Sequence, residues 1–132
     1  MGVYIIINGQ LFHVNFGDTK GSEINNIHLG IILKLPKINN MVLCIPLTSP
    51  KEKHFKTKDN YLKRNHNALK YQNLIYINQT DSIALLDQIR TISTKRLLHT
   101  YKDADNNEIC LNSANLKLIN IRIMKYLKNI FK

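Results

Sequence analysis

The sequence contains few acidic residues, few cysteines and few of the residues that interrupt regular structure. Among 132 residues there are 9 Asp and Glu, 2 Cys, 3 Pro, 5 Gly and no Trp, while 44% are hydrophobic. This composition excludes a disulfide-stapled scaffold and a disordered chain, because enough apolar surface is present to form a core. The length is typical of one domain, so we predict a single domain over residues 1–132.

Several chemical signatures are missing. Cys44 and Cys110 form no CxxC pair and have no clustered histidines around them, so we expect two buried thiols in a reducing cytosol and no zinc site. A glycine-rich phosphate loop and an HExxH motif are also absent. We therefore predict neither nucleotide hydrolysis nor metal catalysis, and no cofactor.

Long hydrophobic runs are missing as well. The apolar segment at residues 3–7 ends at Asn8-Gly9, too soon to cross a membrane, and carries neither a basic leader nor a cleavage site of small residues. We expect a cytoplasmic protein with no membrane partner.

Positive charge is what the sequence does contain. Nineteen Lys and Arg give a formal net charge of +10 and a pI near 9.7. A surface of this kind attracts polyanions, and nucleic acid is the first candidate. Basic composition can also serve solubility alone, so the charge favours nucleic acid without deciding the matter.

Short apolar runs with turn signals between them predict a mainly β fold. We expect strands at residues 3–7, 11–16, 29–33, 41–45, 74–77 and 82–86, with residues 88–92 continuing the last one so that Gln88 and Arg90 share a face. Asn8-Gly9 predicts a hairpin between the first two strands. The expected architecture is a small β-barrel with peripheral helices.

Two helices are predicted near the end of the chain. Ser93 or Thr94 can cap a short helix through Leu98, and Asn112 or Ser113 can cap a longer one. A four-residue apolar rhythm supports the longer helix, which also carries lysines that we assign to a solvated face without a function. The apolar positions are Leu116, Ile119, Ile123, Leu127 and Ile130, and the lysines are Lys117, Lys125 and Lys128.

The segment at residues 51–70, called the flap below, is polar and basic. We predict a surface element, not a core element, that contacts RNA through phosphates and through bases stacked on its aromatic rings. Its cations and histidines are Lys51, Lys53, His54, Lys56, Lys58, Lys63, Arg64, His66 and Lys70.

Chemistry is concentrated where the fourth predicted strand ends. Thr48, Ser49 and Lys51 can hold a phosphate and stabilise the charge of a phosphoryl transition state, although Pro46 and Pro50 would also suit a plain turn. His28, where a polar loop becomes a strand, can act as a general acid or be merely structural. His54, among lysines, is expected to meet a phosphate or a base.

Three spaced blocks of this sequence resemble the MazF/PemK ribonuclease toxins. They are NFGDTKGSE at residues 15–23 with IIL at 31–33, IPLTS at 45–49, and LLDQIRTISTKRL at 85–97. The middle block, extended to Lys51 with His54 three residues on, resembles still more closely the ToxN, AbiQ and CptN toxins, relatives that are neutralised by a structured RNA.

The resemblance implies an SH3-like barrel of the CcdB/MazF/Kid type with a C-terminal helix. It implies metal-independent cleavage of single-stranded RNA to a 2′,3′-cyclic phosphate and a 5′-hydroxyl. Thr48, Ser49 and Lys51 would meet the scissile phosphate. Where MazF-type enzymes carry a catalytic arginine this chain has His28, so either His28 moves the proton or Lys51 supplies the charge. The implied RNA contacts are Gly21, Ser22, Glu23 and Gln88, with Arg90 as a secondary contact that can also be structural.

Two partners are compatible with this resemblance. The leading hypothesis is a type III toxin that binds a repeat-derived antitoxin RNA and processes its precursor. The alternative is a type II toxin with the same chemistry and a protein antitoxin. A homo-oligomer or a toxin–RNA assembly is expected in either case. A third possibility, a non-catalytic binding barrel, is disfavoured by the Thr48, Ser49 and Lys51 set.

Overall fold

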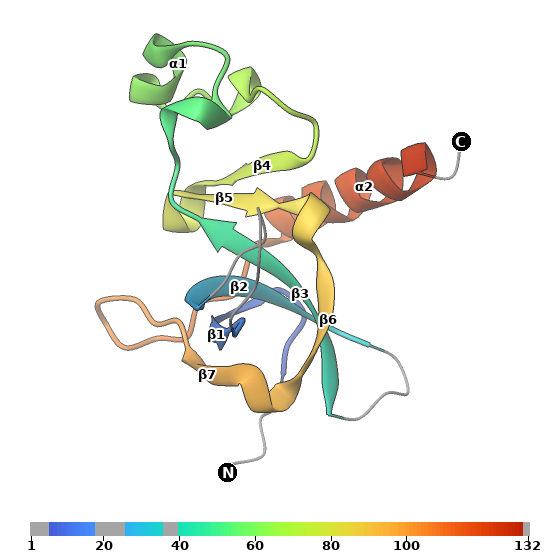
Figure 1. Cartoon of the computed structure of the whole chain (residues 1–132). Coiled ribbons are helices and arrows are strands. Elements are labelled where there is room, and N and C mark those ends of the chain that lie inside the picture. Colours follow the sequence, from blue (N-terminus) through green and yellow to red (C-terminus); the bar gives the residue numbers. More distant parts are fainter. Residues whose placement is uncertain (1–5, 18–25, 36–39, 131–132) are drawn as a thin grey trace.

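The computed structural model describes residues 6–17, 26–35 and 40–130, without the side chains of residues 129 and 130. Seven strands pair antiparallel in the order β4-β5-β3-β2-β1-β7, and β6 also pairs with β3 (Figure 1). The strands are β1 (Gln10–Asn15), β2 (Ile27–Lys34), β3 (Met41–Thr48), β4 (Leu74–Ile77), β5 (Ser82–Leu85), β6 (Arg90–Ser93) and β7 (Leu97–Thr100). The helices are α1 (Lys58–Lys63) and α2 (Ser113–Ile130). The predicted mainly β fold with peripheral helices is confirmed.

Five of the strands curl into the small barrel that the sequence predicts. Neighbours run from β6 through β3, β2 and β1 to β7, and the chain itself joins β6 to β7 through the 3-10 turn η5 (Thr94–Arg96). All five strands contribute to one buried cluster inside the barrel, whose members are Phe12, Val14, Phe16, Ile32, Val42, Cys44, Ile92 and Leu97. Burial of these side chains is the main force that holds the barrel closed.

Strand β3 belongs to two parts of the fold. Its first half, Met41 to Cys44, pairs with β6, while Leu47 and Thr48 pair with Ala84 and Ile83 of β5. Strand β5 in turn pairs with β4, which carries the chain back from the flap (Figure 1). The end of β3 is therefore the junction between the barrel and the outer strands.

Three predicted segments differ from the structure. The hairpin at Asn8-Gly9 is wrong, because both edges of β1 are taken by β2 and β7, although residues 8 and 9 do form a turn with Gly9 at φ +87°; residues 3–5 lie outside the described part. The strand continuing to residue 92 is wrong, because the 3-10 turn η4 (Leu86–Gln88) separates β5 from β6. The helix from Ser93 to Leu98 is only the single turn η5, after which the apolar Leu97 enters β7.

Helix α2 covers the face of the sheet that lies outside the barrel. Asn112 caps it as predicted, its Oδ1 accepting a hydrogen bond from the backbone of Asn115 at 2.8 Å. Ile119 is fully buried, but Leu127 is exposed, and Tyr126 packs against the core instead. A four-residue step advances about 400° around a helix, so eight residues after Ile119 the position has rotated by about 80° away from the core.

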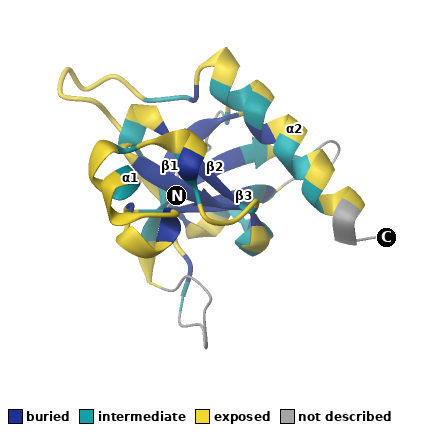
Figure 2. Ribbon diagram, turned by 90° about the horizontal axis from the view of Figure 1, so that it is seen from above, coloured by how far each residue is buried: buried dark blue, intermediate teal, exposed yellow. Residues whose placement is uncertain are grey.

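The flap is a folded element with an interior of its own. It contains η1 (Glu52–His54), α1 and η2 (His66–Ala68), and Phe55 faces Leu69 across an isolated bridge. Phe55 is 3% exposed and packs in a cluster with Leu74, Ile83 and Leu85. The prediction of a surface element without core residues is therefore wrong for this ring, although most of the flap is exposed (Figure 2).

Candidate ribonuclease site

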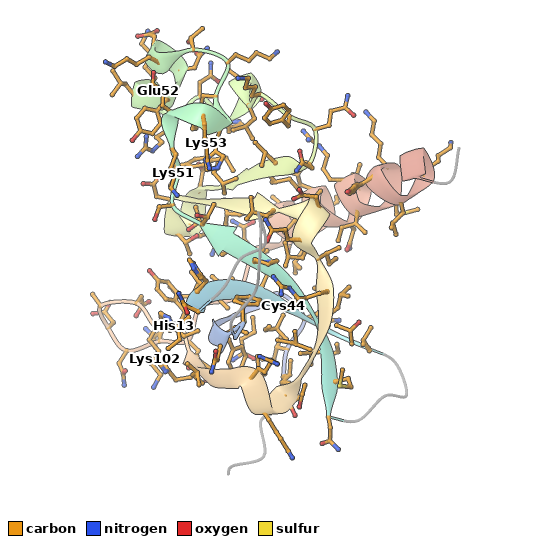
Figure 3. All side chains as sticks on the ribbon, in the orientation of Figure 1. His13, Cys44, Lys51, Glu52, Lys53 and Lys102 are labelled. Carbon is orange, nitrogen blue, oxygen red and sulfur yellow. The ribbon has the colours of Figure 1, made fainter. Side chains whose placement is uncertain are left out.

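Thr48 is the last residue of β3, so the predicted hydroxyl does lie at a strand end. Its neighbour Leu47 is buried in the core beneath α2, and alternation along a strand turns Thr48 to the opposite face, which is the barrel side. Thr48 is half-buried, Ser49 is exposed, and Pro50 is buried and anchors the exit of the chain. Lys51 is exposed at the root of the flap (Figure 3).

His54 holds the backbone of Lys51 in place through two hydrogen bonds. Its Nδ1 accepts a hydrogen bond from the backbone N–H of Lys51 at 3.0 Å, and its own N–H donates to the Lys51 carbonyl at 2.9 Å. On the other side of the flap, the Lys70 N–H donates to the His54 carbonyl at 2.8 Å. Burial, followed by the charges of Lys53 and Lys51, lowers the pKa of His54 below its usual value, which keeps the ring a neutral acceptor.

This finding changes the expected role of His54. Only 6% of the residue is exposed, and its Nδ1 is engaged by the backbone N–H of Lys51. The ring therefore shapes the turn that presents Lys51, and little of its surface is open to a ligand. Sequence reasoning missed this because the lysines around it suggested a fully solvated loop.

His28 and Arg90 approach one another through Phe16. The ring centroids of His28 and Phe16 lie 6.5 Å apart, and the Arg90 guanidinium carbon lies 4.8 Å from the Phe16 centroid, within cation–π range. The Arg90 guanidinium and the His28 imidazole thus share the Phe16 ring, called the Phe16 platform from here on, at one end of the barrel. Phe16 lies in the block at residues 15–23, and the sequence predicts no role for it.

Gly30 makes room for the Cys44 side chain next to this platform. A Cβ at this position would lie 2.7 Å from Cys44 Sγ and 3.3 Å from Val14 Cγ2, and at an ordinary contact distance of 3.6 Å from Phe16 Cζ. The missing side chain therefore accommodates the thiol of Cys44 on the neighbouring strand. Burial raises the pKa of Cys44 to about 12, with the nearby Arg90 charge acting in the opposite direction.

His28 and Thr48 lie beyond the last pair between two neighbouring strands. The register of β2 and β3 ends at Gly30 and Pro46, and His28 and Thr48 each lie two residues beyond that pair. Each is four residues from a position that faces the barrel interior, Ile32 on β2 and Cys44 on β3, so each is on the same face of its strand as that position. The register and the alternation therefore put Thr48 and His28 toward one end of the barrel, where Arg90 and His28 both approach Phe16.

The other predicted RNA contacts fall in different places. Gly21, Ser22 and Glu23 lie outside the described residues. Gln88 is half-buried in η4, two residues before Arg90, so the turn and not a shared strand face sets their relation. Lys53 and Lys56 are exposed on the flap, as expected.

Arg64, a predicted RNA contact, has partners within the chain. Its Nε donates to Asp81 Oδ1 at 3.0 Å and its Nη1 donates to the Tyr61 carbonyl at 2.8 Å, while the guanidinium carbon lies 4.7 Å from the Tyr61 ring. Tyr76 donates to the same Asp81 oxygen, and these hydrogen bonds lower the pKa of Asp81. Arg64 therefore ties the flap to the turn between β4 and β5.

Within the described residues there is no group of three or more His, Cys, Asp or Glu side chains arranged to hold a metal ion. Cys44 is buried as predicted, whereas Cys110 is only half-buried. No helix in the described part of the chain is both long and apolar enough to cross a membrane.

A strongly bent, mainly β sheet closes into a small barrel that carries hydroxyl, imidazole and cationic groups toward one end. The model of the family described as the PemK-like, MazF-like toxin of type II toxin-antitoxin systems matches residues 7–125. The chain therefore belongs to the PemK/MazF-like toxin family, whose toxins are generally endoribonucleases. No curated protein matches the chain.

Proposed function

We propose that this toxin is a metal-independent endoribonuclease that cleaves single-stranded RNA in the cytoplasm. The observation that supports the proposal is the placement of three groups around the end of β3: the Thr48 hydroxyl, the exposed Lys51 three residues on, and His28, which like Thr48 lies two residues beyond the Gly30–Pro46 pair of β2 and β3. A phosphodiester held there meets a hydrogen-bond donor, a positive charge and a group able to move a proton.

The substrate supplies the nucleophile in this reaction. The 2′-oxygen of a ribose attacks the adjacent phosphorus, so that a P–O2′ bond forms while the P–O5′ bond breaks. The 2′-hydroxyl loses its proton and the departing 5′-oxygen gains one, which leaves a 2′,3′-cyclic phosphate and a 5′-hydroxyl. The protein needs only to orient the phosphodiester, transfer protons and neutralise charge.

We assign the charge to Lys51, with Thr48 and Ser49 as donors to the phosphate oxygens, and the proton transfer to His28. Arg90 provides a second cation, because its guanidinium shares the Phe16 ring with His28. A family arginine is expected at the His28 position, and Arg90 brings a guanidinium to the same barrel end from a different strand.

Cleavage of an A-rich single-stranded RNA in EDTA tests this proposal. Lys51→Ala and Thr48→Ala are each expected to lower the cleavage rate by about 10²-fold or more, the usual effect of losing one electrostatic donor, and His28→Ala to lower it less. Lys102→Ala, at an exposed lysine on the loop after β7 and outside the flap, is the matched control and is expected to keep full activity (Figure 3). Cleavage only with added metal, or full activity of the first two variants, would contradict the proposal.

For the antitoxin we propose a structured RNA, which makes this a type III toxin that also processes the RNA precursor. The formal charge of +10 and the exposed lysines of the flap support this partner, since a folded RNA is bound largely through its phosphates. The family description, which names type II systems, favours the second candidate, a protein antitoxin. Tandem short repeats in the adjacent DNA before a terminator support the RNA, whereas an overlapping small acidic reading frame supports the protein.

A further inference from the structure

A second recess lies between the flap and helix α2. One hollow of about 760 Å³ opens beside the loop before β4, the η4 turn and α2, and another of about 360 Å³ adjoins it along the flap. The two hollows share Tyr71, Gln72 and Arg122, so together they form one groove. The groove adjoins β4 and not β3, and β5 lies between these two strands.

The groove is strongly basic. Its described lining includes four cationic side chains and one carboxylate, that of Asp87. Two of the cations, Lys56 and Lys70, come from the flap, and two, Arg122 and Lys125, come from α2. Cations that converge from elements far apart in the sequence favour a polyanionic ligand. The sequence predicted no function for the lysines of the last helix, because the fold that brings Lys125 opposite the flap is not visible in it.

The groove also has the groups that recognise nucleobases. Tyr71 is 57% exposed, and Lys70 Nζ lies 5.8 Å from the centre of its ring. Tyr126 forms part of the other wall and packs against the core through α2. Gln72 and Asn73 add side-chain amides beside the ring. An exposed ring flanked by cations and amides suits an unpaired base that stacks and a backbone that follows the charge.

We propose that this groove binds a single-stranded segment of RNA, with a base stacked on Tyr71 and the phosphates on Lys70, Arg122 and Lys125. The proposal rests on the proposed function only in taking RNA as the ligand, and it uses none of Thr48, Ser49 and Lys51. β4 lies two strands away from β3, roughly 10 Å at the usual strand spacing, and the described lining of the groove shares no residue with the end of β3.

The test measures binding without cleavage. The probe is a fluorescein-labelled 2′-O-methyl oligoadenylate of twelve nucleotides, which has no free 2′-hydroxyl and so cannot be cut by the proposed reaction. Its Kd for the full chain is determined by fluorescence anisotropy at several salt concentrations. We expect about a tenfold weaker Kd for Tyr71→Ala and an unchanged Kd for Tyr71→Phe, because base stacking needs the ring and not the hydroxyl.

A matched pair of lysines on α2 tests the electrostatic part. Lys125 lines the groove, whereas Lys128 is exposed on the same helix and is not part of the described lining. Lys125→Ala is expected to weaken binding and to lower the slope of log K against log salt by about 0.7, the value for one single-strand phosphate contact. Lys128→Ala is expected to leave both quantities unchanged.

Several outcomes would overturn the proposal that this groove binds RNA. No binding of the probe by the wild type, equal Kd values for the wild type and Tyr71→Ala, or equal effects of the two lysine variants would each do so. If the groove variants lose affinity for a hexaglutamate peptide but keep their affinity for the probe, the occupant is an acidic peptide and the proposal is overturned as well.

The result is separable from the proposed catalysis. If the wild type fails to cut RNA in EDTA but Tyr71→Ala loses affinity for the probe, the ribonuclease proposal fails and the groove stands. If the wild type cuts RNA and every groove variant binds the probe normally, the groove fails and the ribonuclease stands.

Discussion

Replacement of His54 tests whether this residue positions the turn that carries Lys51. His54→Asn keeps an acceptor near the position of Nδ1, whereas His54→Ala leaves the Lys51 N–H without its partner at 3.0 Å. One such hydrogen bond contributes about 0.5–1.5 kcal/mol net, and truncation of a ring that is 6% exposed also removes buried contacts. We expect His54→Ala to lower the free energy of unfolding by about 2 kcal/mol and His54→Asn by less.

The same residue makes stability depend on pH. Because the pKa of His54 is lower in the folded protein than in the unfolded chain, the unfolded chain binds more protons just below pH 6.5. The contribution of His54 to the free energy of unfolding is therefore complete above about pH 6.5, and it is lost as the pH falls towards the pKa of the folded protein. The pKa of His13 is lowered by burial and then by the charge of His99, so His13 acts in the same direction. Replacing His54 should therefore reduce the pH dependence of stability without abolishing it.

Urea denaturation followed by circular dichroism between pH 5 and 8 measures both effects. His54→Asn should lose less stability than the wild type on acidification, and His54→Ala should be the least stable protein at pH 7.5. Equal stability of the wild type and His54→Ala at pH 7.5, or the same pH dependence in the wild type and His54→Asn, would refute the reasoning.

Three further predictions concern the core. Gly30→Ala should destabilise the protein by about 1–3 kcal/mol in urea titrations, since its Cβ would meet the buried Cys44 Sγ at 2.7 Å, and the double variant with Cys44→Ala should recover part of the loss. Ile119→Ala should cost about 2–5 kcal/mol and Leu127→Ala less than about 0.5 kcal/mol, and equal losses would contradict the assigned inner face of α2. With a pKa of about 12 and full burial, Cys44 should resist iodoacetamide at pH 8 in the native protein while the half-buried Cys110 reacts first, as mass spectrometry of the labelled peptides can establish.

The parts of the fold that the sequence predicts are those with a strong local pattern. Strand β3, its end at Thr48 and the Asn112 cap of α2 follow from apolar runs, prolines and a capping residue. The division between β5 and β6 does not, because the alternation of residues 82–92 is compatible with one long strand. The 3-10 turn at Leu86–Gln88 is decided by which half of β3 each piece pairs with, which is a tertiary effect.

The candidate site shows the same limit. The exposed Lys51 and the strand-end hydroxyl of Thr48 were predicted from neighbouring residues in the sequence. The contacts of Phe16 with Arg90 and His28 join the residue after β1 to strands β6 and β2, and no local pattern encodes them. The positive charge of the flap predicts the contacts of its individual residues least well. Arg64 and His54 both lie in this basic segment, but Arg64 binds the Asp81 carboxylate and His54 binds the backbone of Lys51.

The double membership of β3 has a consequence for the order of folding. Strands β1, β2 and β3 are consecutive and can pair as soon as they are synthesised, but Thr48 pairs with Ile83, and the barrel closes only when Phe12 meets Thr100. Pairings that distant in the chain form late, because their loop-closure entropy must be overcome first. The end of β3 therefore acquires its last partners near the end of folding, and a chain still emerging from the ribosome lacks the β5 strand against which Thr48 pairs.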